Sequence, residues 1–535
     1  MPLAVCSALL LALALPNDLF PLGSPLFGVV CLAPLLVALY RSRSYGHAAW
    51  LGALFGACSS VLSNFWLLFF QSFSVWTLGG VTLVYLGYHA LLAPILRYAA
   101  GVPRAWRPFA VAAVWALYEY LKSSGYLGYP WGLVGYPVHA ITPLVQFVEI
   151  TGVWGLCLLM AMVNGVAAEW LELLMLAARR VPARLWRGSA VIALLAAAAL
   201  GYGTVALQRE IPAAGNADLV LVQHNANPWL SGDDEGTMRT LEALTAEGMA
   251  AEPTAPDLVV WSETAVRYRM VAPQDPDTVP LAPAALPRLH VPLLTGVPWV
   301  VTQDPFAAMN AAMLVAPGGA VVDHYGKQHL VPFAESVPFW ELPAIRHFFS
   351  QVIGLHAVWV PGGEATIFSL PLRNGGLVRF ATPICFEDAF PDLNRRFIRA
   401  GADLLINLTN DAWSQTVSAE TQHFVAAKLR AVENRRVLIR ATNGGVTAAI
   451  DPWGRVIGEV APLFTATSLR LQVPVYRPSA NTPYTRFGDY LPRLLGLLLV
   501  SWFAVRWRQD RVRSGWRSGR HDDPADSVHR KPPAA

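Results

Sequence analysis

The sequence predicts a multi-span α-helical membrane domain joined to an external α/β domain. First, 54% of the 535 residues are hydrophobic and 14% are charged, whereas a soluble domain carries about 25% charged residues. Second, apolar runs dominate residues 1–207, whereas residues 208–488 have the mixed composition of a soluble domain. Third, β-branched runs alternate with helix-like segments in that second region, which is typical of α/β layer structures.

About eight segments are apolar enough to be candidate spans. Crossing roughly 30 Å of hydrocarbon takes about 20 apolar residues. The segments lie near 3–15, 20–40, 48–70, 76–96, 107–121, 146–176, 188–207 and 489–505. Residues 1–207 thus hold about seven spans, and residues 489–507 form a C-terminal transmembrane helix. The first segment is short, so a signal peptide is its alternative, although no basic residue precedes the apolar run.

Basic residues predict the orientation. They gather in alternate joints between the spans and after the last span: Arg41, Arg43, Arg97, Arg104, Arg107, Arg179, Arg180, Arg184, Arg187, Arg506, Arg508, Arg511 and Arg513. Because positive charge marks cytoplasmic loops, both termini are expected in the cytoplasm and residues 208–488 outside it. The basic tail, residues 508–535, is predicted to be disordered. The net charge of +4 comes largely from these joints and the tail, so no nucleic-acid partner is indicated.

The external domain shows seven strand-like runs and two helix-like segments. The runs are 218–224, 257–261, 290–297, 310–316, 377–385, 402–409 and 446–451, and the helices are 234–250 and 418–436. The second helix carries Phe424, Leu429 and Val432 on one stripe with charges opposite, which is typical of an amphipathic helix. Residues 310–327 read as a hairpin.

Three polar residues lie at or just after the ends of predicted strands, where α/β folds gather their functional groups. They are Glu263, Lys327 and Cys385, the last being the only cysteine outside the predicted spans. A thiol needs a base to become a nucleophile, and a buried carboxylate becomes a better base. An ammonium stabilises the oxyanion formed when a thiolate adds to a carbonyl. This set favours acyl transfer through a thioester, whereas the lack of a CxxC or HExxH pattern argues against a metal.

At this point the sequence resembles a known family. The order Glu, Lys, Cys, in "WSETA", "YGKQHLVPFAE" and "CFED", resembles the carbon–nitrogen hydrolase (nitrilase) superfamily, whose fold is an αββα sandwich. With the spans, and with "GYPWGLVGYP" and "QHFVAAKLRAVENRR", the chain is similar to the bacterial apolipoprotein N-acyltransferases. The resemblance implies a multi-pass protein of the bacterial inner (cytoplasmic) membrane, with a periplasmic nitrilase-like catalytic domain at 208–488.

The resemblance also implies roles and a reaction. Glu263 would be the general base, Lys327 the oxyanion stabiliser and Cys385 the nucleophile, with Glu335 and Glu387 as supporting acids. A phospholipid would donate an acyl chain to Cys385. The α-amine of the N-terminal diacylglyceryl-cysteine of an apolipoprotein would then accept it. No cofactor or metal is implied, because a thioester can acylate an amine directly.

Several positions differ from the pattern of that family. Phe386 stands where the family often has Tyr, and positions 414–420 read SQTVSAE in place of the common Phe-Gly and Gly-Pro pairs. Because these positions lie near the expected substrate, head-group and chain preference stay open. So does the acceptor: a membrane-anchored amidase would use the same three residues with water. A transporter with an external sensor domain predicts ionisable residues within spans, and few are present.

One external segment is unusually aromatic. Residues 337–360 carry Phe339, Trp340, Phe348 and Phe349, which a soluble enzyme seldom exposes. We expect an arm that dips toward the bilayer with these side chains facing lipid. The alternative is an ordinary buried helix.

Overall fold

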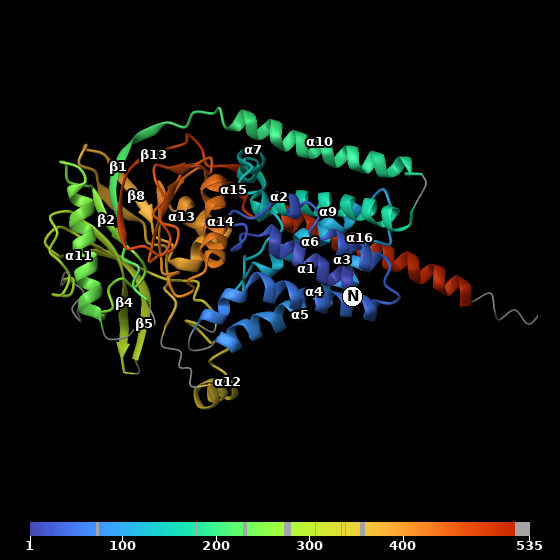
Figure 1. The fold of residues 1–535 in the computed structure, drawn as a ribbon, viewed down its shortest axis with the longest axis horizontal. Coiled ribbons are helices and arrows are strands. Elements are labelled where there is room, and N and C mark those ends of the chain that lie inside the picture. Colours follow the sequence, from blue (N-terminus) through green and yellow to red (C-terminus); the bar gives the residue numbers. More distant parts are fainter. Residues whose placement is uncertain are drawn as a thin grey trace, which may run out of the picture.

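The protein has a helical part and an α/β part that lie end to end (Figure 1). This computed structural model describes residues 1–70, 74–177, 180–227, 233–271, 280–304, 306–332, 334–337, 339–353 and 359–518. The helical part contains the residues up to Ala206 and the helix that begins at Tyr490, and the α/β part lies between them in the chain. Arg179 and the end of the predicted tail, residues 519–535, lie outside the described residues.

Each of the predicted apolar segments contains at least one helix. The longer helices are α1 (Pro2–Ala14), α3 (Ala33–Tyr40), α4 (Tyr45–Ser63), α5 (Ser74–Ala99), α6 (Arg107–Lys122), α9 (Val153–Met175), α10 (Ala183–Ala206) and α16 (Tyr490–Ser518). Short helical pieces join them: α2 (Pro25–Gly28), η1 (Phe65–Phe69), η2 (Tyr136–Val138), α7 (Thr142–Val145) and α8 (Val148–Thr151). The segments at 20–40, 48–70 and 146–176 are therefore each broken, where a single helix was expected.

The break between α8 and α9 has a local cause. Gly152 separates the two helices with a φ of 65°, and a Cβ there would lie 2.5 Å from the ring of Tyr484. Only glycine adopts this backbone conformation without strain and permits this approach. The break lets α15 (Pro483–Phe487) of the α/β part pack against α8.

Three of the described helices are long and apolar enough to cross a membrane: Val75–Ala99, Val153–Met175 and Ala183–Ala206. By contrast, α1 has 13 residues and α6 has 16, below the roughly 17 that a spanning helix needs. Length and composition therefore support a membrane-spanning protein but do not confirm a count of about eight spans. The last helix continues to Ser518. We expected it to end at position 507 and to be followed by a disordered tail.

Two sheets form the core of the α/β part. One has the order β13-β1-β2-β4-β5-β6, with β3 beside β4. Its strands are β1 (Ala213–Gln223), β2 (Leu258–Trp261), β3 (Met270–Val271), β4 (Leu293–Gln303), β5 (Phe306–Val315), β6 (Val321–Gly326) and β13 (Thr467–Tyr476). The other has the order β12-β11-β10-β9-β8-β7. Its strands are β7 (Phe368–Pro371), β8 (Leu377–Ala381), β9 (Leu404–Thr409), β10 (Val437–Thr442), β11 (Ala448–Ile450) and β12 (Val456–Ile457).

Helices cover the outer faces of the two sheets. The sheets meet where β1 contacts β10, while α11 (Asp234–Ala250) packs on β1 and α14 (Val417–Asn434) packs on β10. Beside α14 lies α13 (Pro391–Arg399). The layers are thus helix, sheet, sheet, helix, as the αββα expectation requires, and both predicted helices and all seven predicted strands are present.

Both faces of α14 are largely buried. The stripe is buried as expected, at Phe424, Leu429 and Val432. Most of the charged residues opposite are buried as well, because α14 lies between the second sheet and the helical part. Arg430 pairs with Glu433 at 2.9 Å, and Glu433 accepts the N–H of Val153 at 2.8 Å. The polar face of α14 is thus an interface with the membrane part.

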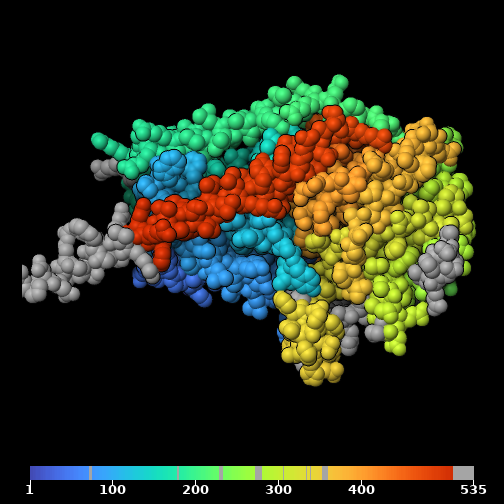
Figure 2. Space-filling view, turned by 180° about the vertical axis from the view of Figure 1, so that it is seen from behind, coloured from blue at the N-terminus to red at the C-terminus, as the bar shows by residue number. Residues whose placement is uncertain are grey.

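The aromatic segment at 337–360 is not a buried helix. Its helices, α12 (Pro343–His347) and η3 (Phe348–Ile353), protrude beside the junction of the two parts (Figures 1 and 2). No residue of α12 is buried. Phe339 is 56% exposed and Phe348 45% exposed, whereas Trp340 and Phe349 are half-buried. The protrusion agrees with the expected arm; residues 354–358 of the predicted stretch lie outside the described residues.

Candidate active site

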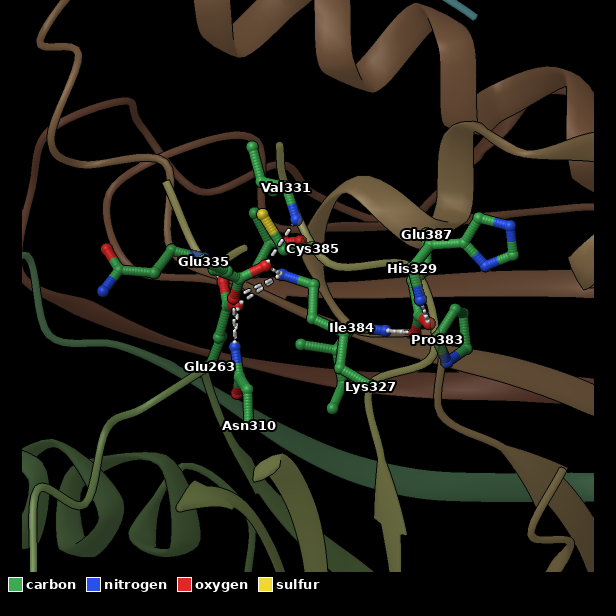
Figure 3. Close-up of polar contacts among 12 residues, drawn as sticks. Glu263, Asn310, Lys327, His329, Val331, Glu335, Pro383, Ile384, Cys385 and Glu387 are labelled. Carbon is green, nitrogen blue, oxygen red and sulfur yellow. Dashed lines mark hydrogen bonds and ion pairs between the residues drawn. The ribbon is translucent and has the colours of Figure 1, made fainter. Parts of the chain in front are cut away.

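The structure brings the three predicted catalytic residues to one place (Figure 3). Glu263 follows β2, Lys327 directly follows β6, and Cys385 begins the short 3₁₀ helix η4 (Cys385–Ala389). All three line the same cavity. Glu263 and Lys327 thus come from the first sheet and Cys385 from the second, so the site lies where the two sheets meet.

Lys327 is held between two carboxylates. Its Nζ donates to Glu263 Oε1 at 3.2 Å and to Glu335 Oε1 at 2.9 Å. Asn310 Nδ2 donates to the same two oxygens, at 2.8 Å each. Burial lowers the pKa of Lys327, but the charges of Glu263 and Glu335 outweigh burial and raise it well above its ordinary value. Lys327 is therefore a permanent buried cation, and two of its three N–H groups are already engaged.

Glu263 is fixed through both of its oxygens. Besides the bonds to Oε1, its Oε2 accepts the backbone N–H of Asn410 at 2.8 Å. A Cβ at Gly296, on β4, would lie 2.7 Å from the Cα of Glu263, so glycine is required for this close packing. Burial raises the pKa of Glu263, and the ammonium of Lys327 only partly opposes that effect. A raised pKa makes this carboxylate a better proton acceptor.

We expected Cys385 to lie at the end of a strand, but it lies beyond one. β8 ends at Ala381, and Pro383, which has no N–H for a ladder, lies between the strand and Cys385. Cys385 has a φ of 50°, an uncommon conformation that clusters at functional sites. Burial and the charge of Glu263 raise the pKa of its thiol well above the ordinary value, although Lys327 opposes them. The thiol is thus protonated at rest, beside a carboxylate that can accept its proton.

Glu387 connects the Lys327 loop to the Cys385 turn. Its Oε1 accepts the backbone N–H groups of Gln328 at 2.7 Å and His329 at 3.0 Å, and its Oε2 accepts that of Ile384 at 2.8 Å. Tyr325 donates its hydroxyl to both oxygens. Burial raises the pKa of Glu387 to about 7 despite these donors. Glu387 therefore positions the two loops and is not directed at the cavity. Glu335 has a similar positioning role, because its Oε2 accepts the backbone N–H of Val331 at 2.8 Å while its Oε1 binds Lys327.

The cavity at this site extends into the helical part. Its volume is about 640 Å³, within the roughly 300–1,000 Å³ typical of small-molecule sites. The catalytic candidates line one region, and apolar residues of α5, such as Val81 and Val84, line another. Phe339 and Phe349 of the aromatic arm also line it, whereas Phe348 and Trp340 do not. Two of the four residues predicted to face lipid therefore border the space that contains Cys385.

A group of buried charges lies behind the Cys385 turn. His423 bonds Asp411 through Nδ1 and Asp388 through Nε2, each at 2.8 Å, and Arg440 pairs with both aspartates. Burial lowers the pKa of His423, but Asp411 and Asp388 outweigh burial and raise it to about 9. Asp388 belongs to η4 and Asp411 follows Asn410, so the group supports both the nucleophile turn and the contact to Glu263. None of these side chains was singled out from the sequence.

This arrangement predicts a loss of stability at alkaline pH. The pKa of His423 is raised from 6.5 to about 9. Its contribution to the free energy of unfolding is therefore fully present below pH 6.5 and is lost as the pH rises through about 9. The contribution is at most about 3 kcal/mol. We expect the thermal midpoint of the detergent-solubilised protein to fall over this range, and to fall less in His423→Asn. An equally steep fall in the variant would show that another group is responsible.

Asn310 and Asn410 are functional residues that the sequence analysis missed. Asn310 could have been found from the sequence, because it is a polar residue inside the otherwise apolar strand β5. The contribution of Asn410 gives no such signal, because it is made by a backbone N–H. No metal site was predicted, and within the described ranges no cluster of three or more His, Cys, Asp or Glu is suited to a metal ion.

Comparison with known proteins gives the family. The family model of the apolipoprotein N-acyltransferase N-terminal domain matches residues 7–166, and that of carbon-nitrogen hydrolase matches residues 220–473. The chain is 36% identical over 510 residues to apolipoprotein N-acyltransferase 2 of Treponema denticola, covering 92% of this chain and 95% of that protein. The chain belongs to the apolipoprotein N-acyltransferase family. The α/β part of this N-acyltransferase-family protein is therefore its carbon–nitrogen hydrolase domain.

Two further relatives agree. Identity is 38% over 533 residues with apolipoprotein N-acyltransferase 2 of Treponema pallidum, covering 93% of each chain. With the apolipoprotein N-acyltransferase of Borreliella burgdorferi it is 29% over 524 residues, covering 95% of this chain and 96% of that one. Because these matches include both the helical part and the hydrolase domain, the predicted resemblance is confirmed over nearly the whole chain.

Proposed function

We propose that the protein transfers an acyl chain from a phospholipid, through a thioester on Cys385, to the α-amine of a diacylglyceryl-modified apolipoprotein. The observation that carries this proposal is the shared cavity. One space is bordered both by the candidate catalytic residues and by apolar side chains of α5. An enzyme that hydrolyses small soluble amides has no need for a site open to membrane helices, whereas an acyl chain needs such an apolar wall.

The first half-reaction acylates Cys385. Glu263 accepts the thiol proton, and the sulfur adds to the ester carbonyl of the phospholipid. The third N–H of Lys327, which neither Glu263 nor Glu335 occupies, stabilises the resulting oxyanion. As the carbon–oxygen bond of the ester breaks, Glu263 returns the proton to the departing alkoxide. The products are a lysophospholipid and an acyl-Cys385 thioester.

The second half-reaction forms the amide. The neutral α-amine of the acceptor adds to the thioester carbonyl, Lys327 again stabilises the oxyanion, and Glu263 takes a proton from the nitrogen. The carbon–sulfur bond then breaks, and the proton held by Glu263 restores the thiol. No cofactor takes part, because the thioester supplies the driving force.

The membrane placement forms part of this proposal. α6 extends about 24 Å from Arg107 to Lys122, which lines the cavity. At the end away from the cavity, Arg107 pairs with Glu169 at 3.0 Å and Arg104 with Glu172 at 2.8 Å. By the positive-inside rule, this basic end is cytoplasmic and the hydrolase domain periplasmic. About eight spans in the inner membrane, with both termini cytoplasmic, agree with this placement.

The aromatic arm is expected to admit lipid to the cavity. Phe348 is exposed and Phe349 lines the cavity, so replacing both by Ser removes one apolar side chain from the surface of the arm and one from the cavity wall. We expect the rate of acyl transfer from phospholipid vesicles to fall about tenfold or more while the domain stays folded. Val322→Ser, which alters an exposed residue on β6, is the matched control and should leave the rate unchanged. Unchanged turnover in the double variant would reject the role of the arm.

The decisive test of transfer against hydrolysis uses two acceptors. Purified protein is given a phospholipid with a labelled chain, together with a diacylglyceryl peptide whose N-terminus is either free or acetylated. We expect the label to enter the free peptide as an amide and to be absent from the acetylated one. Release of the label as free fatty acid with both peptides would instead show a membrane-anchored hydrolase.

A further inference from the structure

A buried lysine of the helical part lines the cavity that contains Cys385. Lys122 is the last residue of α6 and is 6% exposed. Its Nζ donates to the carbonyl oxygen of Trp131 at 2.5 Å and to the hydroxyl of Tyr85 at 3.5 Å, and it lies 5.5 Å from the centre of the Tyr85 ring. These contacts hold the ammonium at the cavity wall, and one of its three N–H groups has no partner among them.

Lys122 has no carboxylate within ion-pair distance, unlike several other buried cations of the described chain. Lys327, Arg430, Arg435 and Arg440 each pair with a carboxylate. Lys122, by contrast, is in none of the ion pairs formed by the residues that the structure describes. Glu119, one turn earlier in α6, is near enough for its charge to act on Lys122, but its carboxylate accepts the N–H of Val134 at 2.8 Å and forms no ion pair with the ammonium. A buried charge is costly unless it is paired, so an anion entering the cavity would find a favourable partner here.

The lysine and the nucleophile line the same cavity. The ring of Trp131, whose carbonyl holds Lys122, stacks on Phe386 with the ring centres 6.2 Å apart. Phe386 directly follows Cys385. The residue whose carbonyl holds the ammonium therefore also packs against the Cys385 turn.

We propose that Lys122 binds the phosphate of the donor phospholipid while its ester carbonyl lies at Cys385. This inference rests on the proposed function and adds the donor subsite to it. In a phospholipid, one glycerol carries both the ester and the phosphate, so the two groups must occupy neighbouring parts of a single cavity. The hydroxyl of Tyr85 provides a second donor beside the ammonium. Because Lys122 recognises phosphate, which every glycerophospholipid head group contains, the subsite distinguishes phospholipids from neutral diacylglycerol.

The test measures binding, so that it does not depend on the chemical step. Full-length Cys385→Ser protein, with and without Lys122→Met, is titrated in detergent with phosphatidylglycerol or with diacylglycerol of the same chains. We expect Lys122→Met to weaken phosphatidylglycerol binding about 10- to 100-fold, as the loss of a charge-assisted contact implies, and to leave diacylglycerol binding unchanged. Lys122→Arg keeps the charge and should retain most of the affinity.

Controls separate this inference from its alternatives. Lys428→Met is the matched variant, because Lys428 also bonds a backbone carbonyl, that of His139 at 3.3 Å, but does not line the cavity; it should bind both lipids as the parent does. If Lys122→Met weakens the binding of both lipids equally, the role of Lys122 is purely structural and the proposal is overturned. Unchanged phosphatidylglycerol binding in Lys122→Met would also overturn it. Inorganic phosphate binding as tightly as the lipid would assign the site to free phosphate. If wild-type protein forms no thioester but this selectivity is present, the proposed reaction fails and the subsite stands.

Discussion

Glu263→Gln is expected to lower the rate of Cys385 acylation by about 10²- to 10⁴-fold, the usual contribution of a general base. Glutamine has the shape of glutamate, but its amide accepts no proton. The thiol of Cys385 has a raised pKa because of burial and the charge of Glu263, so little thiolate forms without this base. The measurement is single-turnover acylation by a labelled phospholipid.

The pH profile identifies the group that is lost. Because burial raises the pKa of Glu263, the wild-type rate should fall on the acid side, beginning above the ordinary carboxyl range, as Glu263 becomes protonated. Glu263→Gln should lack this acid limb, whereas Glu263→Asp, which keeps a base on a shorter side chain, should retain it at a lower rate. A variant that keeps the acid limb and a near-normal rate would remove Glu263 from the mechanism.

Lys327→Met is expected to lower the acylation rate by about 10²- to 10³-fold and to destabilise the protein. The rate falls because the oxyanion loses its donor. The stability falls because Glu263 and Glu335, both within 3.2 Å of Nζ, are left as buried carboxylates without a cation. Breaking a buried ion pair in this way costs about 3–5 kcal/mol. Acylation kinetics and denaturant unfolding of the solubilised protein measure the two effects.

A second substitution separates the two effects of Lys327. Lys327→Met combined with Glu335→Gln removes one of the two stranded charges, so much of the stability should return while the rate stays low. Lys327→Arg keeps a cation but presents a planar fork in place of a point charge, and it should restore stability better than rate. Lys327→Met with a wild-type acylation rate would show that another group stabilises the oxyanion.

The sequence was most informative where the pattern is local. The segment 234–250 begins with acidic residues and became α11 with the same bounds, since caps and periodicity are properties of neighbouring residues. Strands bounded by Pro, Gly, Asp or Asn were located for the same reason. The strand β10 was missed because Arg440 interrupts its apolar run, and only the fold shows that Asp388 compensates this charge.

Burial of charged residues was the main feature that the sequence could not show. The sequence does not indicate that the polar face of α14 is buried. In the structure Arg430 pairs with Glu433 on the same helix. The neighbouring Arg435 pairs with Glu149 of the helical part at 2.6 Å. The site has the same limitation. Glu263, Lys327 and Cys385 were predicted from residue chemistry and from predicted strand ends, although Cys385 lies beyond its strand. The donors that fix the site, such as the backbone N–H of Asn410, have no signature in sequence.

The central claim, that Cys385 carries the acyl chain, is tested most directly by mass spectrometry of the protein after incubation with phospholipid alone. The account predicts an adduct with the mass of one acyl chain on the peptide that contains Cys385, released by hydroxylamine and absent in Cys385→Ser. An adduct of the same mass in Cys385→Ser, or its stable attachment to another residue, would contradict the account.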